Sequence, residues 1–230
     1  MSNLRIAVLA NGSWNSEWGK KELSDVGFLV CADGGGNSAL LSERLPDVLI
    51  GDLDSITPKN LAHCVEAGTK IQRFPKEKDQ TDLELALQYA QRQAPIEFSE
   101  KSIWLYGATG GRIDHFLGNI ALLLAYARQG RKIFLKDPEQ LMWIVQERES
   151  INGHKGQELS LISLAEKAVV TTEGFKYPLD HEILFQDSPR GISNVFLGTE
   201  GFIQVDEGMV LVILNSVHEV RGAMHDAYIR

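Results

Sequence analysis

Short apolar runs alternate with amphipathic segments from the start of the chain to about Asp137. Strands that alternate with helices in this way form a parallel sheet covered by helices on both faces. We therefore predict an α/β domain over residues 1–137. The candidate strands are Arg5–Ala10, Phe28–Ala32, Val48–Ile50, Lys70–Phe74, Ser102–Tyr106 and Lys132–Lys136.

Three of the amphipathic segments between these runs carry the end signals of helices. Thr57 is a suitable N-cap, with Pro58 at the first helical position. Thr81 and Glu84 have the spacing of a capping box, in which each side chain binds the backbone N–H of the other residue. A third helix is expected to begin near Asp114.

After Pro138 the pattern changes to short, often β-branched runs separated by turn signals such as Asn152-Gly153. Short strands at this spacing are typical of a small β-sandwich, which we predict over residues 138–230. The candidate strands are Leu141–Val145, Glu158–Ser163, Ala168–Thr172, Ile192–Leu197, Phe202–Val205 and Val210–Leu214.

Composition narrows the class of protein. The 230 residues, 43% hydrophobic and 23% charged, suit one large globular domain or two modest ones. A net charge of −8 without a basic stripe argues against nucleic-acid binding. The two cysteines form no disulfide framework, and Cys64 is expected to be a buried free thiol. We find neither a signal peptide nor a membrane-spanning run, so we expect a soluble, cytoplasmic protein.

Four clusters of glycine and acidic residues each follow a candidate strand. Because the carboxyl ends of parallel strands meet at one edge of a sheet, we expect the clusters to line one cleft that fits ATP. Glycines allow backbone N–H groups to approach phosphate closely, and Arg112 offers it a planar fork. The clusters are Asp33-Gly34-Gly35-Gly36, Gly51-Asp52-Leu53-Asp54-Ser55, Lys78-Asp79-Gln80-Thr81-Asp82 and Gly110-Gly111-Arg112-Ile113-Asp114-His115.

The second cluster points to a metal. Asp52 and Asp54 share one face of the chain if the segment is extended. Two carboxylates about 5 Å apart repel by roughly 3 kcal/mol at an effective dielectric constant near 20. Mg²⁺ relieves this repulsion and prefers carboxylate and phosphate oxygens. The sequence therefore predicts metal-assisted phosphate chemistry, with Asp82 as a third metal ligand.

Simpler explanations exist for each cluster taken alone. A tight turn alone would explain three consecutive glycines, and Asp54 or Ser55 can help to cap the following helix. Asp82 favours the positive end of its helix dipole. Gly34 and Gly36 also fit a dinucleotide-binding pattern, which leaves a dehydrogenase open, whereas the absent P-loop pattern excludes an ordinary P-loop kinase.

Taken together and in this order, the four clusters resemble the motifs of the thiamine pyrophosphokinase family. The resemblance includes Asn119, five residues after Asp114, and continues through Thr171–Leu179 and Gly191–Asn194. It thus covers nearly the whole chain. One departure is Leu53, where the family usually has phenylalanine, and this substitution leaves both neighbouring acids intact.

The resemblance implies a Rossmann-like catalytic domain that binds nucleotide and metal, followed by an all-β sandwich that binds thiamine and forms a homodimer. Thiamine would lie where the subunits meet. The implied reaction transfers the pyrophosphoryl group of ATP to the hydroxyl of thiamine, releases AMP and depends on Mg²⁺. A pyrophosphokinase for another small alcohol, such as a pterin, and a non-catalytic nucleotide or thiamine sensor stay open.

On this basis we assign roles to individual residues as a hypothesis. Asp52, Asp54 and Asp82 would bind Mg²⁺. Arg112 would neutralise charge on the phosphates, and Asp114 or His115 would serve as the general base. The expected nucleotide contacts are Asp33, Gly34, Gly35, Lys78, Asp79, Gln80, Thr81 and Arg112. The expected thiamine contacts are Lys176, Tyr177, Ser193 and Asn194, with packing inside the sandwich as the alternative for Tyr177.

Overall fold

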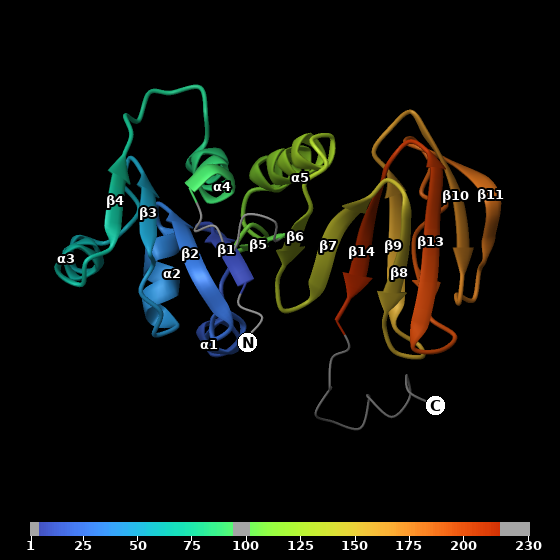
Figure 1. The fold of residues 1–230 in the computed structure, drawn as a ribbon, viewed down its shortest axis with the longest axis horizontal. Helices are drawn as coiled ribbons and strands as arrows, with labels where there is room; N and C mark the ends of the chain where they lie inside the picture. Colours follow the sequence, from blue (N-terminus) through green and yellow to red (C-terminus); the bar gives the residue numbers. More distant parts are fainter. Residues whose placement is uncertain (1–4, 94–101, 217–230) are drawn as a thin grey trace. The chain divides into compact units, whose positions relative to one another are not determined.

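The computed structural model describes residues 5–93 and 102–216. The chain separates into two compact units, Met1–Pro138 and Glu139–Arg230. The first unit is α/β and the second is built from β-strands (Figure 1). Among the helices that the structure describes, none is both long and apolar enough to cross a membrane.

The first unit contains a parallel sheet with strands in the order β6-β5-β1-β2-β3-β4 (Figure 1). All six predicted strands are confirmed, with ends that differ by one or two residues. The strands are β1 (Arg5–Leu9), β2 (Val26–Ala32), β3 (Val48–Gly51), β4 (Lys70–Arg73), β5 (Ile103–Tyr106) and β6 (Ile133–Lys136). The helices are α1 (Ser16–Leu23), α2 (Gly35–Leu41), α3 (Pro58–Glu66), α4 (Asp82–Gln93) and α5 (Ile113–Ala127).

The strand order reverses between β1 and β5. The chain moves outward from β1 to β4 at one edge and then returns to place β5 on the other side of β1. In open α/β sheets, ligands bind outside the carboxyl ends of the strands at such a reversal. The loops that follow β1, β2, β3 and β5 therefore surround the expected binding position.

Helix ends follow the sequence signals closely. Thr57 caps α3 by accepting a hydrogen bond from Asn60 N at 3.3 Å. Thr81 Oγ1 accepts from Glu84 N at 3.1 Å, but the Glu84 carboxylate accepts from Gln88 Nε2. Only the threonine half of the predicted capping box is therefore present.

Alternating side chains divide the sheet of the first unit into two buried faces. One face packs on α1, α2 and α3, and α4 contacts the strands β1, β2 and β3. Cys31 and Cys64 are both buried and free, as expected for Cys64. The cluster facing α1, α2 and α3 comprises Ala7, Leu9, Leu23, Val26, Leu29, Cys31, Ala39, Leu49, Leu53, Ile56, Cys64 and Tyr106.

The second unit consists of two sets of antiparallel strands, in the orders β12-β9-β14-β7 and β11-β10-β13-β8. Alternate residues of β9, β10 and β13 are buried. The rings of Phe175 and Phe196 meet edge-on with centroids 4.6 Å apart. The strands are β7 (Gln140–Val145), β8 (Arg148–Asn152), β9 (Glu158–Ser163), β10 (Lys167–Glu173), β11 (Leu179–Phe185), β12 (Asn194–Val195), β13 (Glu200–Glu207) and β14 (Val210–Asn215).

Two strands of the second unit were not predicted from the sequence, and one predicted strand was too long. β8 and β11 each bury only one side chain, Ile151 and Leu184, so neither shows an apolar alternation. The predicted strand Ile192–Leu197 is wrong in extent, since β12 pairs only over Asn194–Val195. Ser193 has a left-handed backbone (φ 59), which interrupts extended pairing.

Candidate functional site

Three carboxylates converge at the carboxyl edge of the parallel sheet. Asp33 follows β2, Asp52 follows β3 and Asp82 begins α4. One oxygen of each lies within 4.8 Å of the others. Gly51 leaves room for this approach. A Cβ at this position would lie only 3.0 Å from Asp82 Cγ, and the backbone φ of 147 is one that residues with side chains rarely adopt. The arrangement is a set of hard oxygen ligands suited to a divalent cation.

The Asp82 carboxyl sits in an unfavourable electrostatic position. Burial raises its pKa above the usual range, and the charges of Asp52 and Asp33 act in the same direction. Lys78 opposes this effect, with its Nζ 3.0 Å from Asp82 Oδ1. Apart from this ion pair, the buried oxygen has no partner among the described residues. A bound cation would neutralise the negative charge that remains on the three carboxylates.

Asp54 lies outside this cluster. The chain leaves β3 at Gly51 and turns at Leu53, whose φ is 64. The expectation that Asp52 and Asp54 share a face of an extended segment is therefore wrong. Lys76 Nζ donates to Asp54 Oδ2 at 2.6 Å, and this hydrogen bond is the main reason why the pKa of Asp54 is lowered. The role of Asp54 as a metal ligand stays a prediction.

Asn37 holds the loop that carries Asp52 and Asp54. Its Nδ2 donates to Ser55 O at 3.0 Å. Its Oδ1 accepts from Thr57 N at 3.1 Å and from Asn60 Nδ2 at 2.8 Å. This one side chain in α2 thus ties the loop to the start of α3.

The three glycines after Asp33 have packing reasons. A Cβ on Gly34 would overlap the side chain of Asn11, and one on Gly35 would lie 2.1 Å from Leu9 O. A Cβ on Gly36 would lie 2.8 Å from Ile56 Cδ1. The glycines therefore let α2 pack tightly on the sheet and on the β1 loop. Whether Gly34 and Gly35 also bind nucleotide stays a prediction.

The fourth cluster forms the loop from β5 into α5. Arg112 and Asp114 are exposed and form an ion pair through two hydrogen bonds. The Arg112 side chain lowers the pKa of Asp114 to about 2. His115 is exposed in the first turn of α5. Asn119 Nδ2 donates to Ala108 O at 2.8 Å, which fixes the loop against the helix.

The third cluster surrounds the start of α4. Lys78 is largely buried and donates to Pro75 O at 3.0 Å in addition to facing Asp82. Asp79 and Thr81 are exposed, and Gln80 is half-buried. The four residues predicted to contact nucleotide here thus lie beside the acidic cluster.

The predicted thiamine contacts gather at one place in the second unit. Asn194 is buried, accepts from Tyr177 N at 3.0 Å and donates to Tyr177 O at 2.7 Å. The Tyr177 side chain is 58% exposed, so it does not pack in the core. Lys176 Nζ lies 5.4 Å from the Tyr177 ring centroid, and Ser193 is exposed beside Asn194. The structure therefore brings these four residues together.

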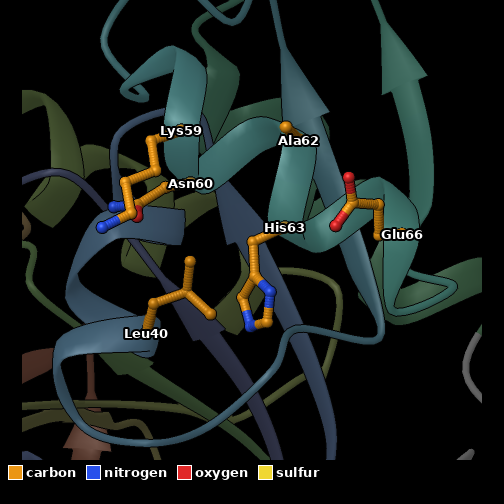
Figure 2. A pocket seen from close by; sticks show the side chains of 6 residues that line it. All are labelled: Leu40, Lys59, Asn60, Ala62, His63 and Glu66. Carbon is orange, nitrogen blue, oxygen red and sulfur yellow. The ribbon is translucent and has the colours of Figure 1, made fainter.

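A separate hollow of about 520 Å³ lies between α2 and α3. Figure 2 shows His63 of α3 pointing toward Leu40 of α2. None of the residues predicted for the site lines it. Its lining residues are Leu40, Lys59, Asn60, Ala62, His63 and Glu66.

Sequence reasoning missed parts of the site or misjudged them. Asp33 was expected only to contact nucleotide, yet it belongs to the acidic cluster. The parallel pairing of β2 with β3 explains this, because both strands end at the same edge. Lys76 and Asn37 carried no signal of their own, since their partners lie more than 15 positions away. Asn11, which lies beside Gly34, was also missed. Its place directly after the first predicted strand was a signal that could have identified it, because the other clusters also follow strands.

Comparisons with known proteins cover both units. A family model described as thiamin pyrophosphokinase, catalytic domain, matches residues 20–135. A second, described as thiamin pyrophosphokinase, vitamin B1 binding domain, matches residues 144–210. A thiamine pyrophosphokinase of Bacillus subtilis (strain 168) is 33% identical over 187 residues, which cover 80% of this chain and 85% of that protein.

Solved structures agree with these matches. The crystal structure of thiamine pyrophosphokinase from Bacillus subtilis has a TM-score of 0.81 at 29% identity, and the match covers 93% of this chain and 100% of that one. The crystal structure of thiamin pyrophosphokinase from Geobacillus thermodenitrificans has a TM-score of 0.77 at 28% identity, and it covers 94% and 99%.

Proposed function

The chain belongs to the thiamine pyrophosphokinase family, and we propose that it transfers the pyrophosphoryl group of ATP to the hydroxyl of thiamine and releases AMP. The observation that carries this proposal is the convergence of Asp33, Asp52 and Asp82 beside the loops at the sheet reversal. Transfer of a highly charged group requires positioning and charge neutralisation, and this edge of the sheet offers both.

Mg²⁺ is the proposed cofactor, and the residues present fit it. Asp33, Asp52 and Asp82 offer oxygen ligands, and in the described part of the chain the buried Asp82 Oδ1 has only the Lys78 ammonium beside it. Asp54 is a further proposed ligand. To bind the ion, its carboxylate would have to leave its ion pair with Lys76. When bound, the ion supplies charge neutralisation at the phosphate oxygens.

Side chains around the acidic cluster would orient the nucleotide. Arg112 is exposed on the β5 loop and can turn its guanidinium from Asp114 to a phosphate, where it forms charge-assisted hydrogen bonds. Lys78 holds positive charge beside Asp82. The backbone N–H groups of Gly34 and Gly35, together with Asp79, Gln80 and Thr81, are further proposed contacts.

The proton of the thiamine hydroxyl needs an acceptor. Asp114 has a pKa lowered to about 2 by Arg112, which makes it a weak base in that pairing. His115 in the first turn of α5 is exposed and is the better proposed acceptor. In-line attack then depends mainly on how the two substrates are held.

The second unit is the proposed thiamine-binding and dimerisation domain, in which the two antiparallel sets of strands form a β-sandwich. Asn194 fixes the backbone of Tyr177 by two hydrogen bonds, so that the exposed ring is held for contact. Lys176 and Ser193 complete the proposed thiamine side. ATP and thiamine are the proposed substrates, and a second copy of the chain is the proposed partner.

One experiment tests the function directly. The protein is incubated with ATP, Mg²⁺ and thiamine, and nucleotides and thiamine esters are separated by chromatography. We expect AMP and thiamine diphosphate in equal amounts and neither product when thiamine is omitted. Formation of ADP with thiamine monophosphate, or preference for a pterin alcohol in competition, would contradict the proposal.

A further inference from the structure

Asn11 occupies the loop after β1, directly at the point where the strand order reverses. This loop is fixed to the β5 loop by backbone hydrogen bonds: Gly12 N donates to Gly107 O at 2.6 Å and Ser13 N to Thr109 O at 2.9 Å. Backbone hydrogen bonds of the two residues that follow Asn11 therefore position it beside the β5 loop.

The other neighbour of Asn11 is Gly34, at the start of α2. A Cβ on Gly34 would lie 2.3 Å from Cγ and Oδ1 of Asn11 and 2.5 Å from Nδ2. Gly34 has an ordinary helical φ of −59, so its backbone does not require glycine. The atoms nearest to a Cβ at position 34 all belong to the carboxamide of Asn11, which therefore lies against the backbone of Gly34, the residue directly after Asp33.

The Asn11 carboxamide is exposed and makes no hydrogen bond with any residue that the structure describes. Two other asparagines at this edge of the sheet differ from it. Asn37 uses both ends of its side chain to hold the Asp52 loop, and Asn119 donates to Ala108 O. Those two have structural partners, whereas Asn11 holds its donors and acceptor toward solvent.

We propose that Asn11 is a further nucleotide-binding residue, whose Nδ2 donates a hydrogen bond to a phosphate oxygen of ATP. This inference rests on the proposed function for its ligand. The carboxamide lies against Gly34, which directly follows Asp33, and the Asp33 carboxylate belongs to the acidic cluster where the phosphates are proposed to bind. A neutral donor suits that position, because it binds an anionic oxygen without pairing with the acids and competing for the cation.

Equilibrium binding of ATP in the presence of Mg²⁺, without thiamine, tests the inference by calorimetry. Loss of a hydrogen bond to a charged oxygen is expected to weaken ATP binding by roughly 10- to 100-fold in Asn11→Ala. Asn11→Asp, which has the same shape, is expected to bind still more weakly because it repels phosphate. The KM for thiamine should be unchanged in Asn11→Ala.

Asn15→Ala is the matched control. Asn15 lies four residues along and caps α1 by accepting from Trp18 N at 2.9 Å, so its loss affects stability alone. Wild-type ATP affinity in Asn11→Ala, an equal loss in Asn15→Ala, or Asn11→Asp binding as tightly as wild type would each overturn the inference.

The two proposals fail in different ways. A wild-type protein that binds ATP but forms no thiamine diphosphate contradicts the proposed function, and the Asn11 variants still decide the role of this residue. A wild-type protein that does not bind ATP overturns both.

Discussion

At the scale of single residues, the acidic cluster works against folding. One oxygen each of Asp33, Asp52 and Asp82 lies within 4.8 Å of the others, and one such pair repels by about 3 kcal/mol at an effective dielectric constant near 20. Asp33 also has a left-handed backbone (φ 43). The fold keeps these groups together through surrounding contacts, which is typical of functional sites.

Asp33→Asn tests this conflict between stability and activity. Asparagine tolerates the left-handed backbone, and its Oδ1 can still accept the hydrogen bond from Ser55 N. We expect the metal-free melting temperature to rise by about 2–4 °C per kcal/mol of repulsion removed. AMP formation should fall by about 100-fold or more, because cation binding contributes several kcal/mol to such reactions.

Asp25→Asn is the control for this measurement, since Asp25 is an exposed acid whose ion pair with Arg5 is long, at 4.0 Å. It should change neither the melting temperature nor the rate. Full activity in Asp33→Asn, measured over a range of Mg²⁺ concentrations, would exclude Asp33 from the metal site.

The pKa of Asp82 predicts a pH dependence of metal-free stability. Burial raises this pKa above the ordinary 3.8, so the folded protein holds the proton more tightly than the unfolded chain. The stability that the folded protein gains from holding this proton is complete below pH 3.8 and is lost as pH rises through the raised pKa. Urea unfolding across that range should show that wild type loses stability with rising pH relative to Asp82→Asn.

Mg²⁺ should remove the same difference, because the cation replaces the proton. The ion should also bind more weakly as pH falls through the raised pKa of Asp82. Parallel stability curves for wild type and Asp82→Asn in metal-free buffer would show that burial of this carboxyl carries no electrostatic penalty.

At the scale of elements, glycines decide how closely helices approach the sheet. A Cβ on Gly35, the first residue of α2, would lie 2.1 Å from Leu9 O. Gly118, inside α5, has no atom within 4 Å of its Cβ position. The same substitution should therefore have opposite effects at the two positions.

Gly35→Ala and Gly118→Ala make this comparison. Gly35→Ala should lower the free energy of unfolding by about 1–3 kcal/mol through overpacking. Gly118→Ala should raise it by about 0.5–1 kcal/mol, because alanine loses less backbone freedom in a helix. Urea unfolding measures both, and a stable Gly35→Ala protein would show that α2 can move away from β1.

At the scale of the whole molecule, the proposed partner is a second copy. Among its described residues, the second unit exposes large apolar side chains, and their burial against a second copy would be favourable. These are Tyr177, Ile183, Phe185, Ile192 and Leu197. We expect sedimentation at assay concentrations to give twice the 25.5 kDa mass of one chain. An active species that sediments as a single chain would exclude the dimer.

The strands of the first unit and the helices α3, α4 and α5 were predictable because their signals are local, whereas α1 was not predicted. The apolar runs of β1 to β6 and the end signals at Thr57 and Thr81 each lie within a few residues of one another. In the second unit, β8 and β11 face solvent on most of their length, so local hydrophobicity gave no sign of them.

The sequence by itself determined the α/β character of the first unit, the change to strands near Pro138, the four clusters and the family, because each depends on residues close together in the chain. Only the tertiary structure decided that Asp33 joins Asp52 and Asp82 while Asp54 pairs with Lys76. The physical reason is that strand pairing and the left-handed turn at Leu53 set these distances, and neither follows from spacing along the chain.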